Sequence, residues 1–140
     1  MNYEEAWLTE NIVDLFPLEW QEDILRNIHY GRGMYEAAVL FGPSGALVGA
    51  GGVRQNEERQ WVAWIWVGSE KPADRLALLR RAYRWLKNWQ CRTGYTLYAI
   101  VYEHNPIGQK LARWMGFTEE GKYIHHQKPE NNFGVWIRER

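Results

Sequence analysis

Apolar and polar residues follow two different periods along the 140-residue chain, and each change of period predicts a new element. Short runs rich in apolar and β-branched or aromatic residues predict strands. These runs cover residues 35–41, 46–54, 60–67, 95–102, 117–126 and 133–138, with a weaker strand within 5–13. The run from Gln60 to Val67 is the most apolar, which predicts a central position in a sheet.

Apolar residues that recur every three or four positions predict a helix over residues 17–30 and a longer one over 72–90. Gly31-Arg32-Gly33 is expected to end the first helix, and Gly94 the second. The side chains expected to face the core are Leu18, Ile24 or Leu25, and Ile28 in the first helix, and Leu76, Leu79, Tyr83 and Leu86 in the second.

Three glycines in the strand 46–54 predict a close approach from another part of the chain. Gly49, Gly51 and Gly52 have no side chains, so this strand leaves space on its surface. We expect a large side chain, a Trp or a Tyr, to lie across it.

The segment from Tyr95 to Phe117 combines a strand, a short helix and the start of another strand. Asn105 is a good N-cap, and Pro106 fits the first helical position, where no backbone donor is needed. Gly116 can adopt the left-handed geometry that ends a helix. The expected apolar stripe of this short helix is Ile107, Leu111 and Met115.

The spacing in this segment resembles that of the GNAT superfamily of acyl-CoA-dependent N-acyltransferases. The family pattern is an Asn, a small residue three positions on, a Tyr seven on and Gly-Phe eleven on. Asn105, Gly108, Gly116 and Phe117 match it, whereas Ala112 stands where the family has its Tyr. The resemblance implies an α/β (α+β) fold with one domain over residues 1–140. It also implies a mixed, mostly antiparallel sheet that is flanked by helices and contains a central, splayed pair of parallel strands.

The resemblance also implies that the turn between residues 67 and 72 holds the pyrophosphate of acetyl-CoA, because the amides and dipole of a helix N-terminus attract anions. This turn lacks the family's Gly pair, Pro72 removes an amide donor, and Glu70 and Asp74 add negative charge. It therefore resembles a degraded anion site, although carboxylates at a helix start also stabilise the helix without any ligand. The residues expected to bind the cofactor are Val67, Gly68, Ser69, Lys71, Arg75 and Asn105, with Lys71 and Arg75 contacting phosphate.

Acyl transfer to an amine needs a base for the amine and a proton donor for the leaving thiolate. Ala112 has no hydroxyl, so Tyr102 is a candidate donor, with Tyr123 as an alternative. His104 is the candidate general base because it follows a strand at the edge where α/β sheets place ligands, and Glu103 is a second candidate. The commoner explanation for the tyrosines is an ordinary surface or core side chain, and for His104 a solvated loop residue.

Two functions therefore remain open. The chain is either an N-acyltransferase that acts on an amine of a small molecule or protein, or an inactive GNAT-like module for binding or assembly. In the second case its partner is another protein or a second copy. The aromatic strand, the altered turn and the apolar residue at position 112 are similar to those of GNAT-like proteins of short-tailed bacteriophages, some of which are internal virion components.

Composition limits the remaining classes. Residues 1–60 carry ten acidic and four basic side chains, whereas residues 71–92 carry seven basic and one acidic. The basic helix could bind nucleic acid, but pairing with the acidic half is the favoured interpretation. The sequence contains no membrane span or secretory signal, has the single cysteine Cys91, and is expected to be cytoplasmic, or in the virion if phage-encoded. No metal site is expected, because the neighbouring His125 and His126 would point to opposite faces of a strand.

Overall fold

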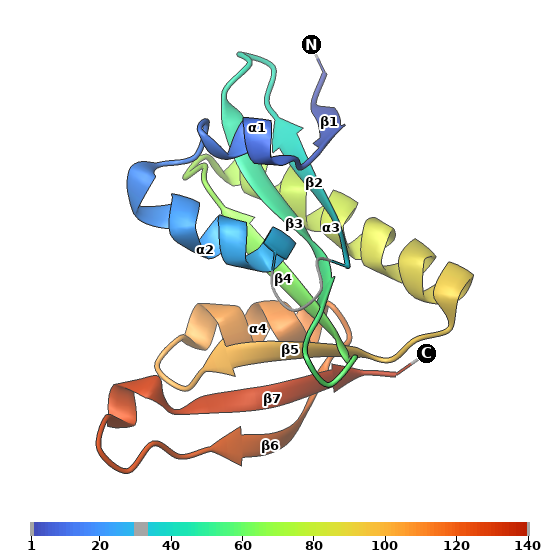
Figure 1. Cartoon of the computed structure of the whole chain (residues 1–140). Coiled ribbons are helices and arrows are strands. Elements are labelled where there is room, and N and C mark those ends of the chain that lie inside the picture. Colours follow the sequence, from blue (N-terminus) through green and yellow to red (C-terminus); the bar gives the residue numbers. More distant parts are fainter. Residues whose placement is uncertain (1, 30–33, 140) are drawn as a thin grey trace.

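The computed structural model describes residues 2–29 and 34–139. Strands and helices follow one another in an order that the sequence pattern largely predicts (Figure 1). The elements are β1 (Glu4–Trp7), α1 (Glu10–Val13), α2 (Leu18–His29), β2 (Tyr35–Phe41), β3 (Leu47–Gln55), β4 (Trp61–Val67), α3 (Pro72–Thr93), β5 (Leu97–Tyr102), α4 (Pro106–Trp114), β6 (Thr118–Tyr123), the 3-10 turn η1 (Pro129–Asn131) and β7 (Phe133–Arg138). The expected glycine end of α2 at 31–33 lies outside the described residues.

The strands form one mixed sheet in the order β1-β2-β3-β4-β5-β7-β6. Every neighbouring pair is antiparallel except β4 and β5, which are parallel. These two strands pair only where they begin, through Trp61 with Leu97 and Val62 with Tyr98, and then diverge. This confirms the predicted fold class: a mixed, mostly antiparallel sheet with a splayed parallel pair at its centre.

Helices cover both faces of the sheet, but not equally. Side chains of α1 and α2 pack with one face of β2 and β3, where Phe16, Ile24 and Ile28 are buried. The opposite face packs against α3 and α4, and Leu86 of α3 and Trp136 of β7 are buried in this layer. In Figure 1, α1 and α2 lie in front of the upper strands, whereas no helix lies in front of β5, β7 and β6. One face of the C-terminal half of the sheet is therefore uncovered.

The inward faces of the two longer helices differ in part from expectation. In α2, Ile24 and Ile28 are buried, but Leu18 is 84% exposed. Leu18 lies six residues before Ile24, which at about 100° per residue places it some 120° away from the buried stripe. In α3, Leu76 is 47% exposed, and Leu78 faces the core in its place. The short helix α4 shows the same effect, because Met115 is buried whereas Ile107, in its first turn, is exposed.

The glycines of β3 do receive a close neighbour, but it is not the aromatic side chain that the sequence led us to expect. A Cβ atom added at Gly49 would lie 2.4 Å from a methyl group of Leu78 on α3. At Gly52 the obstacle is the backbone of β2, since an added Cβ would lie 2.2 Å from the carbonyl oxygen of Glu36. The glycines thus let α3 and β2 approach β3 closely.

No helix in the described part of the chain is both long and apolar enough to cross a lipid bilayer.

Candidate functional site

The divergence of β4 and β5 opens a cavity of about 280 Å³ at the centre of the molecule. Its walls come from β4, β5, α3 and α4, and it extends beneath α3 as far as β1. The lining is mostly apolar; its aliphatic part in the splay includes Ala63, Ile65, Ala99, Val101 and Leu111. Mostly apolar clefts with a few polar groups are typical ligand sites.

The start of α4 forms one end of this cavity. Asn105 caps the helix as predicted, its side-chain oxygen accepting a hydrogen bond from the amide of Gly108 at 2.9 Å. Gly108 is needed because an added Cβ would lie 2.6 Å from the side-chain nitrogen of Asn105 and 3.1 Å from Val101. Both Asn105 and Gly108 line the cavity.

Ala112 lies one turn further along α4 and also lines the cavity. Ala112 is 6% exposed and belongs to the buried core between the sheet and the helices α3 and α4. The residue at this position therefore faces the splay but offers only a methyl group. No proton can be donated to a ligand from here.

The turn between β4 and α3 shows how the expected anion site is built. The amides of Gly68 and Ser69 both donate to the carbonyl oxygen of Val48 on β3, at 2.8 and 3.0 Å. These two amides are therefore used within the sheet. The amide of Lys71 donates to the Ser69 hydroxyl at 3.2 Å, so it too has a partner inside the turn.

Asp74 places a carboxylate in the first turn of α3. One of its oxygens accepts a hydrogen bond from the Ser69 hydroxyl and the other from the Tyr3 hydroxyl, each at 2.7 Å. The bond from Ser69, and then that from Tyr3, lowers the pKa of Asp74 below its usual value. The same bond to Asp74 raises the pKa of Tyr3. The protein thus supplies its own anion where the family resemblance placed a phosphate.

Lys71 and Arg75 flank this turn with exposed side chains. The Nε of Arg75 donates to the carbonyl oxygen of Ser69 at 2.9 Å. With Val67, Gly68 and Ser69, they form the predicted turn, but none of the five lines the cavity. A bound pyrophosphate would depend on the side chains of Lys71 and Arg75 more than on the turn amides.

The three candidate catalytic residues follow one another where β5 ends, but they do not meet in one place. Tyr102 lines the cavity, and among the described lining residues it alone carries a hydroxyl group. Glu103 and His104 are exposed and lie outside the lining. The ring of His104 lies beside that of Tyr102, with centroids 5.8 Å apart.

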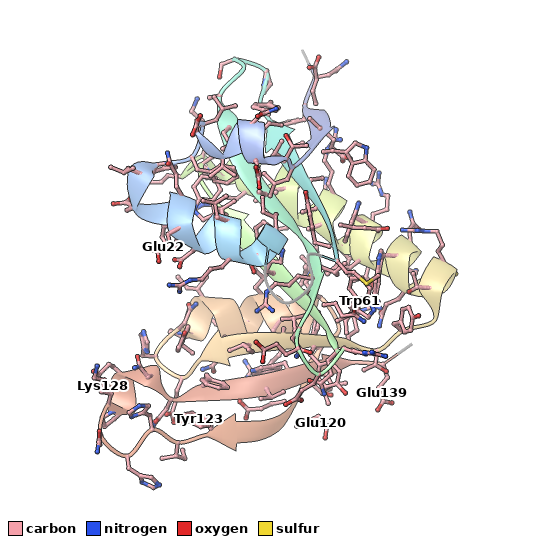
Figure 2. The ribbon with its side chains drawn as sticks, in the orientation of Figure 1. Glu22, Trp61, Glu120, Tyr123, Lys128 and Glu139 are labelled. Carbon is pink, nitrogen blue, oxygen red and sulfur yellow. The ribbon has the colours of Figure 1, made fainter. Side chains whose placement is uncertain are left out.

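The carboxylate of Glu103 is held by the C-terminal loop. This carboxylate accepts a hydrogen bond from the side-chain amide of Asn132 at 3.1 Å. The backbone amide of Glu103 donates to the carbonyl oxygen of Asn132 at 2.9 Å. This places Glu103 as a support for the loop before β7. Tyr123 lies on the exposed edge strand β6 (Figure 2). Its ring stacks on that of Phe133, and it does not line the cavity.

The basic charge of α3 is partly compensated by the acidic N-terminal half, as the favoured interpretation held. Arg81 pairs with Glu5 on β1 and Arg92 with Glu36 on β2, each at 3.0 Å. Among the described residues, no group of three or more His, Cys, Asp or Glu side chains is placed to hold a metal ion.

Sequence reasoning missed three contributors to this region. Tyr3 reaches Asp74 across 71 residues of sequence, and no local pattern signals such a contact. Ala38 and Ala82 line the cavity beneath α3. The glycines of β3 were a signal of open space there, but they did not show which elements would enclose it.

The fold is shared with known acyltransferases. The structure matches the spermidine N-acetyltransferase SpeG F149A mutant from Vibrio cholerae with a TM-score of 0.68 at 16% identity, over 96% of this chain and 94% of that one. It matches a protein provisionally assigned as a phosphinothricin N-acetyltransferase with a TM-score of 0.72 at 14% identity, over 99% and 98% of the two chains.

A third match, to a GnaT-family acetyltransferase assignment from Bordetella pertussis, has a TM-score of 0.62 at 18% identity and covers 74% of this chain. The chain spans only 65% of the length of that protein. The chain has the GNAT fold. No protein-family model matches the sequence, and no curated protein matches it.

Proposed function

We propose that this GNAT-fold chain binds an acyl-CoA, such as acetyl-CoA, in the splay between β4 and β5 and transfers the acyl group to an amine. The observation that carries the proposal is the parallel pair that separates after two residues and opens directly into an apolar cavity. A thioester arm in this splay would be removed from water along much of its length. The proposed acceptor is an amine of a small molecule or of a protein. We propose the cytoplasm as the place where the protein acts.

In the reaction, a neutral amine forms a bond to the thioester carbon, the carbon–sulfur bond breaks, and the thiolate takes up a proton. Tyr102 is the proposed proton donor because it lines the cavity where β5 ends and, among the described lining residues, it alone carries a hydroxyl group. His104 is the proposed base that receives the amine proton, since its ring lies beside Tyr102 at the open end of β5. Asn105 fixes the start of α4 at the same end, and Lys71 and Arg75 are proposed to hold the phosphates.

The proposal is tested with purified protein, acetyl-CoA and a panel of polyamines, amino acids and lysine peptides. Release of free thiol is followed, and acetyl-CoA binding is measured by calorimetry. Turnover should fall about 10²- to 10⁴-fold in Tyr102→Phe or His104→Ala, the usual contribution of a proton-transfer group. Tyr123→Phe is a matched control that removes a hydroxyl outside the cavity. Absence of both binding and turnover across the panel would refute transfer of an acetyl group from acetyl-CoA.

A second candidate function, a non-catalytic GNAT-like module, is favoured by two observations. Ala112 and the carboxylate of Asp74 occupy the positions from which a family enzyme would donate a proton and bind phosphate. The uncovered face of β5, β7 and β6 also presents large exposed side chains, among them Ile100, Tyr102 and Tyr123. Such a patch is typical of a contact with another protein chain.

For this second function we propose self-association through the uncovered face. Sedimentation of the wild-type chain and of Ile100→Lys distinguishes it, because a charge at the centre of a buried patch opposes pairing. Leu15→Lys is a matched control on an exposed residue outside that sheet face. If the wild-type protein is a monomer at all concentrations, self-association is rejected. If that monomer also releases thiol from acetyl-CoA, the acyltransferase function is the one that remains. A bacteriophage origin and a place in a virion remain a hypothesis that rests on the sequence resemblance alone.

A further inference from the structure

The cavity is larger than the splay requires, because it continues beneath α3 across the sheet. Its lining includes Ala38 on β2, Gly51 on β3 and Glu5 on β1, together with Ala82 of α3. Neighbouring strands lie about 4.8 Å apart, so a path from β5 to β1 crosses roughly 19 Å of sheet. We call this extension, lined by Ala38, Gly51, Ile65, Leu78 and Ala82, the sub-helix chamber.

Small side chains create the chamber. Ala38, Gly51 and Ile65 form one cross-strand row, so two of its three members contribute a methyl group or nothing. The three atoms nearest to a Cβ added at Gly51 all belong to β4: the carbonyl oxygen of Trp64 at 2.9 Å and two atoms of Ile65 at 3.6 and 3.7 Å. No atom of α3 therefore lies closer to this position than 3.7 Å. At Gly49, two residues away, Leu78 of α3 would lie within 2.4 Å. The helix therefore packs most tightly on the sheet at Gly49 and stands further from it at Gly51, which lines the cavity.

The chemistry of the chamber selects an apolar occupant. Its charged side chains are Glu5 and Arg81, which pair with each other at 3.0 Å. Between this ion pair and the splay, most lining side chains are aliphatic and offer few hydrogen-bond partners to water, which needs two to four of them. A mostly apolar path that starts in the proposed thioester site suits an unbranched hydrocarbon chain.

We infer that the sub-helix chamber binds the hydrocarbon tail of an acyl donor, so that the preferred donor carries a medium-length acyl chain and not an acetyl group. This inference rests on the proposed acyl-CoA binding. The chain of the donor would run from the splay beneath α3 towards the Glu5–Arg81 pair. The step itself is unchanged, since only the length of the transferred acyl group differs.

The first experiment measures binding of acetyl-, butyryl-, hexanoyl- and octanoyl-CoA by calorimetry. Each methylene group removed from water strengthens binding about fourfold. Hexanoyl-CoA is therefore expected to bind on the order of a hundredfold more tightly than acetyl-CoA. Equal affinities across the series would overturn the chamber while leaving acyl-CoA binding intact.

Filling the chamber should remove this preference. Ala82→Leu extends a side chain from α3, and Ala38→Leu does so from β2, so that one variant can replace the other if its folding is impaired. Ala77→Leu is the matched control, because it adds the same atoms to α3 at a half-buried position outside the lining. The filled variants should bind hexanoyl-CoA no better than acetyl-CoA, whereas the control should keep the wild-type preference. A preference unchanged in both filled variants would overturn the inference.

Sodium octanoate, titrated alone, separates the chamber from the proposed function. If octanoate binds the wild type and Ala77→Leu but not Ala82→Leu, the chamber is supported even when no CoA ester binds, and only the acyltransferase proposal fails. If neither octanoate nor any ester binds, both are rejected.

Discussion

Asp74 is the residue that most clearly separates this chain from an anion-binding GNAT turn. Its carboxylate accepts hydrogen bonds from Ser69 and Tyr3 at the start of α3, so a negative charge already occupies the positive end of that helix. A pyrophosphate at the same place would be repelled by it. The sequence allowed two interpretations of this turn, a degraded anion site and a helix start stabilised by carboxylates. Both apply, because the carboxylate that stabilises the helix start is also the group that degrades the anion site.

Replacing Asp74 by Asn should strengthen acetyl-CoA binding about two- to fivefold, the range of a single charge at a helix end. The amide can still accept a hydrogen bond, but the repulsion of phosphate is lost. Calorimetric titration at low salt measures the change. Glu70→Gln is a control that removes a charge from the same turn without breaking a bond to Ser69 or Tyr3. Weaker binding by Asp74→Asn would show that the carboxylate does not oppose the phosphates.

Tyr3 gives a stability prediction at alkaline pH. The bond to Asp74 raises the pKa of Tyr3 above its unfolded value of 10.0. The contribution of this group is therefore fully present below pH 10 and is lost as the pH rises through the folded pKa. Thermal melts from pH 8 upwards should show a loss of stability in the wild type that is smaller in Tyr3→Phe. Identical pH profiles of the two proteins would contradict the assignment.

At the scale of elements, α4 owes its start to a single capping side chain. Asn105 accepts the amide of Gly108, and Pro106 follows it without needing an acceptor. Asn105→Ala should cost about 1 kcal/mol of unfolding free energy, whereas Asn105→Ser should retain most of the cap. Urea unfolding of the three proteins measures the difference. Equal losses in both variants would show that stability depends on the amide's other contacts and not on the cap.

Most elements were predictable because their signals are local. Gly116 adopts the predicted left-handed geometry with a φ of 90°, Gly94 ends α3 as expected, and the cap of α4 is the predicted Asn105. The faces of the helices were less predictable. Leu18 and Leu76 are apolar residues near a helix start that nevertheless remain exposed. Periodicity identifies a stripe, but the neighbouring elements decide how much of it is buried.

At the scale of the whole molecule, the central splay was expected from the family resemblance, whereas the cavity was not. Its walls combine β1 with α4, which are about one hundred residues apart in the sequence. The residues that shape the cavity are alanines and a glycine, and their role depends on which distant elements pack against them. A local sequence pattern does not show such neighbours, and for the same reason it did not show the contact of Tyr3 with Asp74. Candidate residues next to a motif, such as Tyr102 and Asn105, could be found from the sequence because the motif fixes their place on the fold.

The two parts of the sheet, β1–β4 and β5–β7–β6, share only a two-residue strand pairing, so side chains must join them. Gln90 on α3 is one such side chain and is 2% exposed. Its amide nitrogen donates to the carbonyl oxygens of Tyr95 and Arg138, at 3.1 and 2.7 Å, and its oxygen accepts from the guanidinium of Arg138. Arg138 in turn donates to the carbonyl oxygen of Met115 at 2.8 Å. One buried amide thus connects α3 with the start of β5 and the end of β7.

Gln90→Met keeps the length of this side chain but removes its hydrogen bonds, leaving buried carbonyl groups and a guanidinium without their partner. We expect a loss of about 1–3 kcal/mol in unfolding free energy. Because the lost bonds lie at the junction, amide hydrogen exchange should accelerate in β5 and β7 more than in β2 and β3. Gln127→Met is the control, at an exposed position in the loop after β6. Unchanged stability, or acceleration spread evenly over the sheet, would mean that packing between the helices and the sheet joins the two parts without Gln90.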